Sequence, residues 1–126
     1  PYGLLTVSIL HVNNTRDRAN DWRAGLCTLP LLTGWRTACW VYVAEQVLPY
    51  LLVLAFVVCG FSSRPSVVCL LLTFVSLPMA LRNIRAITAA KTEEEQRIDT
   101  LDQQSAQLQL AFGLLYTVGF AVATIW

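Results

Sequence analysis

The sequence predicts an all-α fold, a multi-span bundle of transmembrane helices, and three observations support this. Apolar residues make up 56% of the 126 residues, and charged residues only 13%, about half the share of roughly 25% in a soluble domain. The mean hydropathy is positive, at +0.54. The charged residues are also clustered, which leaves stretches long enough to cross a bilayer almost free of charge.

The apolar stretches predict about three full spans and the end of a fourth. A crossing needs about 20 residues, so the short apolar stretch at the start is expected to be the end of a span. The expected elements are the end of a span at 1–12, a polar loop or short helix at 13–36, full spans at 37–60, 66–87 and 108–126, and a polar helix or loop at 88–106.

Proline and glycine residues mark special points within the predicted spans. Pro49 lies inside the span 37–60 and is expected to kink it, because proline removes a helical hydrogen bond. Pro78 lies inside the span 66–87. Gly113 and Gly119 in the last span would let a neighbouring helix approach closely.

The basic residues predict the orientation of the chain. Four arginines lie in the segment 13–36, and three arginines and a lysine lie in 82–106, so eight of the nine basic residues fall on one side of a two-span hairpin. The positive-inside rule places that side in the cytoplasm, matrix or stroma. The organelle stays open, and a mitochondrial inner membrane or a thylakoid would fit.

Charge and cysteine content exclude two classes of function. A net charge of +1 provides no basic stripe for nucleic acid. The four cysteines contain no C-x-x-C pair and there is a single histidine, His11, which argues against structural zinc. The cysteines are therefore expected to be small buried hydrophobic residues.

The polar segment 13–36 contains a pattern of oxygen ligands. Asn13, Asp17 and Asp21 are each four residues apart, so on a helix they share one face. Mg²⁺ takes such hard oxygen ligands together with water and substrate phosphate oxygens. The alternative is an ordinary interfacial loop in which both aspartates pair with neighbouring arginines, and the D-x-x-x-D spacing alone does not decide between these interpretations.

Residues 13–25, NNTRDRANDWRAG, resemble the second aspartate-rich motif of the UbiA superfamily of intramembrane prenyltransferases, in its MenA-type branch. Residues 48–51 (LPYL), 77–80 (LPMA) and 111–116 (AFGLLY) are also similar to that branch. The resemblance implies a nine-helix fold, of which this chain is the C-terminal portion. It also implies Mg²⁺-dependent transfer of a prenyl group from a prenyl diphosphate to an aromatic acceptor, as in quinone biosynthesis.

The same resemblance implies roles for individual residues. Asp17 and Asp21 would activate the diphosphate through Mg²⁺, with Asn13 as a further ligand. The residues expected to contact substrate are Asn13, Asn14, Arg16 and Arg23. Glu45 is charged within a span, where ionisable groups are costly and often functional. It would either face the cavity, to orient the acceptor or accept its proton, or pair with another helix, whereas His11 is expected to be a packed or interfacial residue.

Three and a half spans cannot enclose a prenyl chain and an aromatic head group, so the chain is expected to be incomplete as a catalyst. A missing segment or another chain would then supply the N-terminal half, with membrane lipid around both. The alternative is a non-catalytic structural subunit of a larger membrane complex, for example an electron-transfer supercomplex. Neither the acceptor nor the prenyl length can be inferred from these residues.

Overall fold

A computed structural model describes residues 1–59, 67, 71–92 and 98–125 of the chain. Its elements are α1 (Tyr2–Arg16), α2 (Arg18–Arg23), α3 (Leu29–Thr33), α4 (Trp35–Val58), the 3₁₀ helix η1 (Phe74–Ser76), α6 (Leu77–Ala89) and α7 (Leu101–Ile125). The described residues contain no β-strand. This confirms the predicted all-α fold class.

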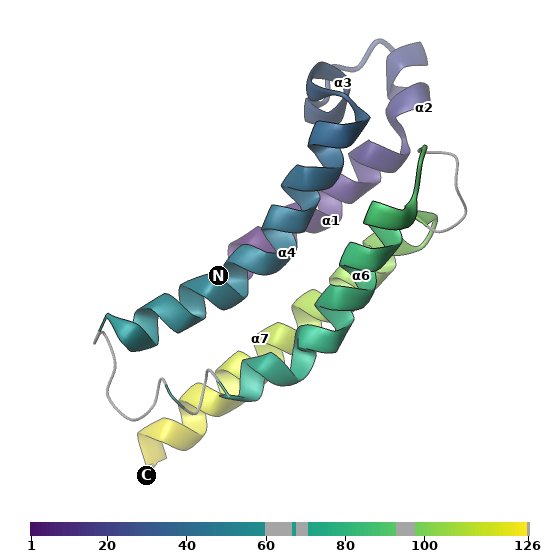
Figure 1. The fold of residues 1–126 in the computed structure, drawn as a ribbon. Helices are drawn as coiled ribbons and strands as arrows, with labels where there is room; N and C mark the ends of the chain where they lie inside the picture. The colour runs from purple at the N-terminus through teal and green to yellow at the C-terminus, as the bar shows by residue number, and fades with distance from the viewer. Residues whose placement is uncertain (60–66, 68–70, 93–97, 126) are drawn as a thin grey trace.

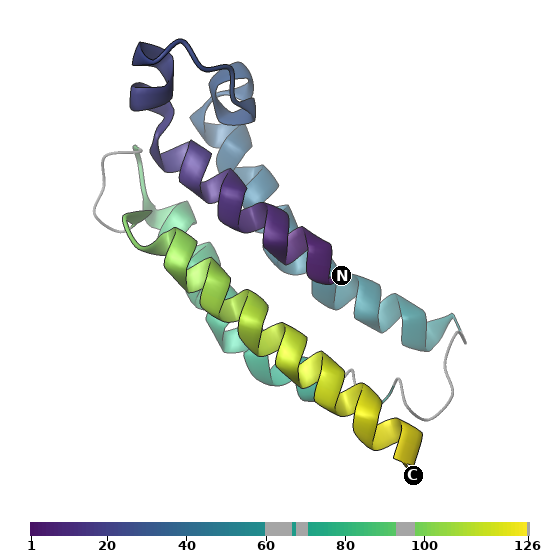
Figure 2. The ribbon, with the colours of Figure 1, turned by 180° about the vertical axis from the view of Figure 1, so that it is seen from behind.

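The four longer helices form an up-and-down bundle (Figure 1). In Figure 1, α4 and α6 lie on the near side, and Figure 2 shows α1 and α7 running antiparallel on the opposite side. The packing of α1 against α7 and against α4 is the most extensive in the bundle. The short helices α2 and α3 cap the end at which α1 ends and α4 begins.

Two of the described helices are long and apolar enough to cross a membrane, namely Trp35–Val58 and Leu101–Val122. Together they make the chain a membrane-spanning helical bundle. The predicted span 66–87 lies partly outside the described residues, at 66 and 68–70. Its described part includes η1 and most of α6.

Pro49 lies in the interior of its helix, whereas Pro78 lies at the start of its helix. α4 continues through Pro49 without a break in the assigned helix. Pro78 instead lies in the first turn of α6, directly after η1. The first turn of a helix tolerates proline because its N–H groups have no partner within the helix.

The polar segment predicted at 88–106 contributes to two helices. α6 ends at Ala89, and Ala90 is extended, whereas residues 93–97 lie outside the described part of the chain. α7 begins at Leu101, well before the apolar stretch expected to start at residue 108. Asp102 lies in its first turn, where a carboxylate is favoured by the helix dipole, and its Oδ1 accepts a bond from the Gln103 N–H at 2.8 Å.

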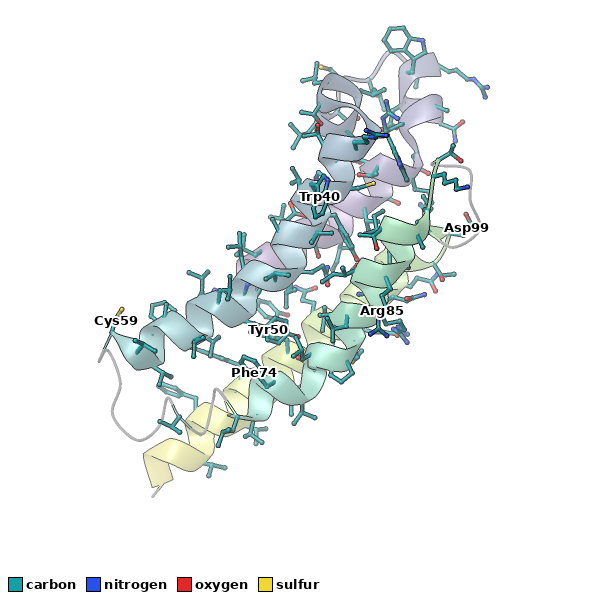
Figure 3. The ribbon with its side chains drawn as sticks, in the orientation of Figure 1. Trp40, Tyr50, Cys59, Phe74, Arg85 and Asp99 are labelled. Atoms are coloured by element: carbon teal, nitrogen blue, oxygen red, sulfur yellow. The ribbon has the colours of Figure 1, made fainter. Side chains whose placement is uncertain are left out.

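One hydrophobic cluster contains residues from each of the segments 48–51, 77–80 and 111–116. The Tyr50 ring meets Phe112 edge-on at a centroid distance of 5.4 Å and Phe74 at 5.5 Å, and Tyr50 and Phe74 face each other between α4 and α6 in Figure 3. The Tyr50 hydroxyl bonds Ser76 Oγ at 2.7 Å. The buried members are Leu5, Tyr50, Val53, Ala80, Leu108 and Phe112.

A second hydrophobic cluster lies toward the capped end of the bundle. It consists of Val12, Tyr42, Ile87, Ala90, Ile98 and Leu101. Ile98 and Leu101 are fully buried, so burial of apolar surface holds the start of α7 against the end of α1. The Tyr42–Ser105 hydrogen bond of 2.6 Å adds a polar link between α4 and α7. This packing sets the position of the polar residues that follow on α1.

Gly113 lies at a close approach of α1 and α7. A Cβ at this position would lie 2.6 Å from Cε2 of Tyr2. The expectation of close helix packing at Gly113 therefore has a specific partner.

The expectation of buried cysteines is wrong for Cys27 and Cys59, which are exposed in the α2–α3 connection and at the end of α4 (Figure 3 labels Cys59). Cys39 is partly buried, and Cys69 lies outside the described residues.

Candidate functional site

Asn13, Asp17 and Asp21 lie along the junction of α1 and α2. α1 ends at Arg16, and Asp17 separates the two helices with φ −89° and ψ 10°. The backbone bonds nevertheless keep the four-residue register, because the Asp17 N–H donates to the Asn13 carbonyl at 3.0 Å and the Asp21 N–H donates to the Asp17 carbonyl at 2.9 Å. The three residues thus follow one another at successive turns, in a helix with a local bend.

Arg16 connects two members of this series. Its Nε donates to Asp17 Oδ1 at 3.0 Å, and its Nη2 donates to Asp17 Oδ2 at 3.4 Å and to Asn13 Oδ1. The pKa of Arg16 is raised, mainly by its hydrogen bond to Asp17, so this guanidinium stays charged. Arg16 therefore fixes the side-chain orientation of both residues.

Arg16 also connects the motif to the start of α7. Its Nη1 donates to the Asp99 carbonyl at 2.9 Å and lies 3.3 Å from Asp102 Oδ1. Asp99 lies beside the capped end of the bundle in Figure 3. Neither acidic residue was among the expected site residues. The one signal in the sequence was the acidic character of the segment before the last span, which is opposite in charge to the basic segment 13–36. No spacing of residues in either segment indicated which side chains would pair.

Asp21 is separate from the hydrogen-bonded group around Arg16. Its Oδ2 atom is buried and has no hydrogen-bond partner among the described residues. A buried polar atom without a partner costs about 1–3 kcal/mol, and more when it is charged. The environment of this oxygen is therefore suited to a cation or a donor that the described residues do not provide.

The other expected substrate contacts occupy different positions. Asn14 is half-buried on α1, and Arg23 is exposed at the end of α2. Arg23 lines a hollow of about 480 Å³ together with Arg18 and Trp22. Arg18 Nε donates to the Pro30 carbonyl at 3.0 Å, which ties α2 to α3.

The donor chemistry of the motif fits a hard divalent cation. Asn13, Asp17 and Asp21 supply one amide and two carboxylate groups at successive turns, and oxygen ligands of this kind suit Mg²⁺. Within the described residues, no group of three or more His, Cys, Asp or Glu side chains converges. The amide of Asn13, or oxygens from outside this chain, would therefore have to complete a metal site.

Glu45 lies in the interior of the bundle on α4, whereas the motif residues belong to α1 and α2. Its Oε1 is 3.8 Å from Nδ1 of His11, and His11 Nε2 bonds the Ala38 carbonyl at 2.9 Å. Glu45 Oε2 is buried without a hydrogen-bond partner in the described part of the chain. Glu45 and His11 thus connect α4 to α1, and His11 is a packed residue.

The comparisons with known proteins decide the family. The UbiA prenyltransferase family model matches residues 1–98. The chain belongs to the UbiA prenyltransferase family. The match covers the whole motif, both short capping helices and the described part of α6. The structural features described above are therefore those of a UbiA-family chain.

Curated relatives match over 98% of this UbiA chain. It is 35% identical to the UbiA prenyltransferase domain-containing protein 1 homolog of Drosophila melanogaster, and 33% and 32% identical to UbiA prenyltransferase domain-containing protein 1 of Homo sapiens and Gallus gallus, each over 123 residues. The chain spans about a third of their length, with 31% of the first and 33% of the other two covered. No solved structure gives a significant match.

Proposed function

We propose that this UbiA chain supplies one half of the site of an intramembrane prenyltransferase, which transfers a prenyl group from a prenyl diphosphate to an aromatic acceptor in quinone biosynthesis. The observation that carries the proposal is the buried Oδ2 of Asp21, which has no hydrogen-bond partner among the described residues. It continues the four-residue register of Asn13 and Asp17. An ordinary interfacial loop in which both aspartates pair with arginines does not account for this oxygen.

Asn13, Asp17 and Asp21 are the residues that would hold Mg²⁺. When bound, the ion would neutralise negative charge on the diphosphate and so stabilise it as a leaving group. Arg16 holds the side chains of Asn13 and Asp17 in place through these same oxygens, so a bound ion would share them with the guanidinium or displace it.

The residues of this chain act on the diphosphate end of the reaction. The C–O bond of the allylic diphosphate breaks and its electron pair leaves with the diphosphate, while a ring carbon of the acceptor bonds the prenyl carbon and then loses its proton. Asn14 and Arg23 would donate hydrogen bonds to phosphate oxygens, and Arg16 would do so on releasing one of its present acceptors. Glu45, whose Oε2 is buried without a described partner, is the candidate group to orient the acceptor or take up that proton.

The remaining part of the active site would come from outside these residues. The relatives are about three times as long as this chain, and four helices do not enclose both substrates. We therefore place the other aspartate-rich motif on another segment or chain. The eight basic residues on one side favour a cytoplasmic, matrix or stromal location for the capped end of the bundle.

Asp17→Asn and Asp21→Asn test the proposal in membranes that contain the assembled protein. Each change keeps the size of the side chain and removes a negative ligand, so Mg²⁺-dependent binding of a labelled prenyl diphosphate and its transfer to naphthoate, hydroxybenzoate or homogentisate acceptors should be lost. Asp99→Asn is the matched control, because Asp99 contributes its backbone carbonyl to the Arg16 contact. Unchanged binding and turnover in both motif variants would refute the catalytic role.

One observation favours the alternative of a structural subunit. Arg16 already occupies the oxygens of Asn13 and Asp17 and connects them to α7, which is also what a stabilising interfacial contact would do. In that case Asp17→Asn would lower the stability of the bundle without changing diphosphate binding. Measuring both quantities on the same variant separates the two functions.

A further inference from the structure

A layer of polar side chains lies in the interior of the bundle, between its two hydrophobic clusters. Each of the four longer helices contributes one residue, which falls between the residues that the same helix gives to the two clusters. This polar layer consists of Ser8, Gln46, Asn83 and Ser105, all completely buried. Buried polar groups are almost always hydrogen-bonded in folded proteins, so the partners of each residue show what the layer holds.

The two serines of the polar layer have their hydrogen bonds within the bundle. Each donates its single hydrogen to a backbone carbonyl of its own helix, over 2.8 Å from Ser8 and 2.7 Å from Ser105. Ser8 Oγ accepts from Gln46 Nε2 at 3.0 Å, and Ser105 Oγ accepts from the Tyr42 hydroxyl at 2.6 Å. These bonds join α4 to α1 and to α7. Among the described residues of the layer, only Asn83 of α6 takes no part in them.

The contact between α4 and α6 in this layer is not complete. Gln46 Oε1, Asn83 Oδ1 and Asn83 Nδ2 are buried and have no hydrogen-bond partner among the described residues. Each such atom costs about 1–3 kcal/mol, and the hydrocarbon around a membrane bundle supplies no partner. Because neither residue has exposed surface, a protein segment packed on the outside of the bundle does not reach these atoms. Only a small molecule between the two helices can pair with them.

Gln46 and Asn83 lie at the same level of α4 and α6, which run antiparallel (Figure 1). Tyr50 bonds Ser76 at 2.7 Å, and the hydroxyl of Tyr42, two turns earlier on α4, lies next to the Asn83 side chain. Gln46 lies midway between these two tyrosines, so it faces the same part of α6. It also lines a hollow of about 260 Å³ between the two helices, which leaves room beside its amide.

We propose that ordered water lies between α4 and α6 in the polar layer and bridges Gln46 to Asn83. Water suits the site because the two oxygens need donors and the NH₂ group needs an acceptor, and a water molecule is both. Buried waters in proteins typically make about three hydrogen bonds to groups of this kind. A metal cation would leave Asn83 Nδ2 without an acceptor, and a lipid chain would leave all three atoms unpaired.

The bridge fixes the position of α6 along α4. Apolar contacts allow one helix to slide past another, whereas a buried polar pairing is satisfied in one register only. The proposal does not depend on the prenyltransferase function, because the motif residues 13–21 belong to other elements. Glu45, to which a role toward the acceptor is given above, is not needed for the bridge.

Water-edited solid-state NMR of the whole protein in lipid bilayers tests the site. The measurement follows magnetisation that passes from water to nearby nitrogen nuclei of the ¹⁵N-labelled protein. The side-chain amides of Asn83 and Gln46 should receive it at short mixing times, like the exposed Gln103. Leu5 and Phe112, which are buried in the first hydrophobic cluster, should receive it slowly. Transfer to Asn83 that is as slow as transfer to Leu5 would overturn the proposal.

Three variants separate a bridging water from other causes. Asn83→Leu removes both amide atoms at similar volume, so the early water signal of Gln46 should be lost. Asn83→Ser keeps a hydroxyl and leaves room for water, so the signal should persist, and this variant controls for misfolding. Asn20→Leu makes the leucine change at an exposed position of α2 and should leave the Gln46 signal unchanged.

Two further results would contradict the bridge. A Gln46 signal that survives in Asn83→Leu would show that its water does not depend on Asn83. A melting temperature that rises in sodium chloride but not in choline chloride, with the rise lost in Gln46→Leu, would identify a bound cation in place of water. With bridging water, the melting temperatures in the two salts should agree for both proteins.

Discussion

The hydrogen bond between Tyr50 and Ser76 has a direction that makes a stability test possible. Ser76 Oγ lies 2.7 Å from the Thr73 carbonyl, to which it donates its single hydrogen. The 2.7 Å bond between the two hydroxyls must then be donated by Tyr50. Both residues are buried, and they connect α4 to η1.

The two single variants are therefore expected to differ in cost. Tyr50→Phe keeps the ring contacts with Phe74 and Phe112 and leaves the Ser76 hydroxyl with its carbonyl partner, so it should cost about 0.6 kcal/mol, a typical value for a hydrogen bond between membrane helices. Ser76→Ala leaves the buried phenol without its acceptor and should cost about 1–3 kcal/mol. The double variant has no unpaired hydroxyl and should cost less than the sum of the two.

The free energy of unfolding in mixed detergent micelles, followed by the loss of helical circular dichroism, measures all three variants. Tyr2→Phe is the control, because this tyrosine is 48% exposed and its change should stay within about 0.5 kcal/mol. A Tyr50→Phe variant that is as destabilised as Ser76→Ala, or a double variant equal to the sum, would refute the assigned direction of the bond.

Two further predictions concern contacts of α7. Gly113→Leu should destabilise the bundle by about 1–3 kcal/mol through overpacking, because a Cβ there meets the Tyr2 ring at 2.6 Å. Adding the Tyr2→Ala change should recover part of this loss, as measured by thermal unfolding. If the double variant recovers nothing, the clash does not involve the Tyr2 ring. Asp102→Asn removes the partly exposed 3.3 Å ion pair with Arg16 and should cost about 0.2–1 kcal/mol. That difference should shrink in high salt because of screening, and a difference independent of salt would contradict an ionic origin.

The fold class could be predicted because it depends on local patterns. Runs of apolar residues and the placement of charge indicate membrane helices without any knowledge of their partners. The four-residue spacing of Asn13, Asp17 and Asp21 likewise becomes a sequence of backbone bonds one turn apart. The bend at Asp17 did not follow from that spacing, since no proline or glycine near residue 17 indicates a break in the helix.

The partners of Arg16 could not be predicted in the same way. Asp99 and Asp102 are more than eighty positions away along the chain, and their approach depends on how Ile98 and Leu101 pack with the other members of the second hydrophobic cluster. Exposure of Cys59 is a similar case, because burial depends on which faces of α4 have a neighbour rather than on residue type. The Gly113–Tyr2 approach was predicted only as a tendency, and its partner became known from the packing of α1 on α7.

The pairing of α1 with α7 also affects the order of events during biosynthesis. These two helices are the first and last long helices of the described chain, and they form one of its most extensive contacts. At about 5–20 residues per second, a ribosome needs several seconds after making α1 before α7 emerges. During that interval α1 can pack on α4 but lacks its other main neighbour, so the newly made chain presents to the insertion machinery and to the surrounding lipid an apolar helix face that the finished bundle covers.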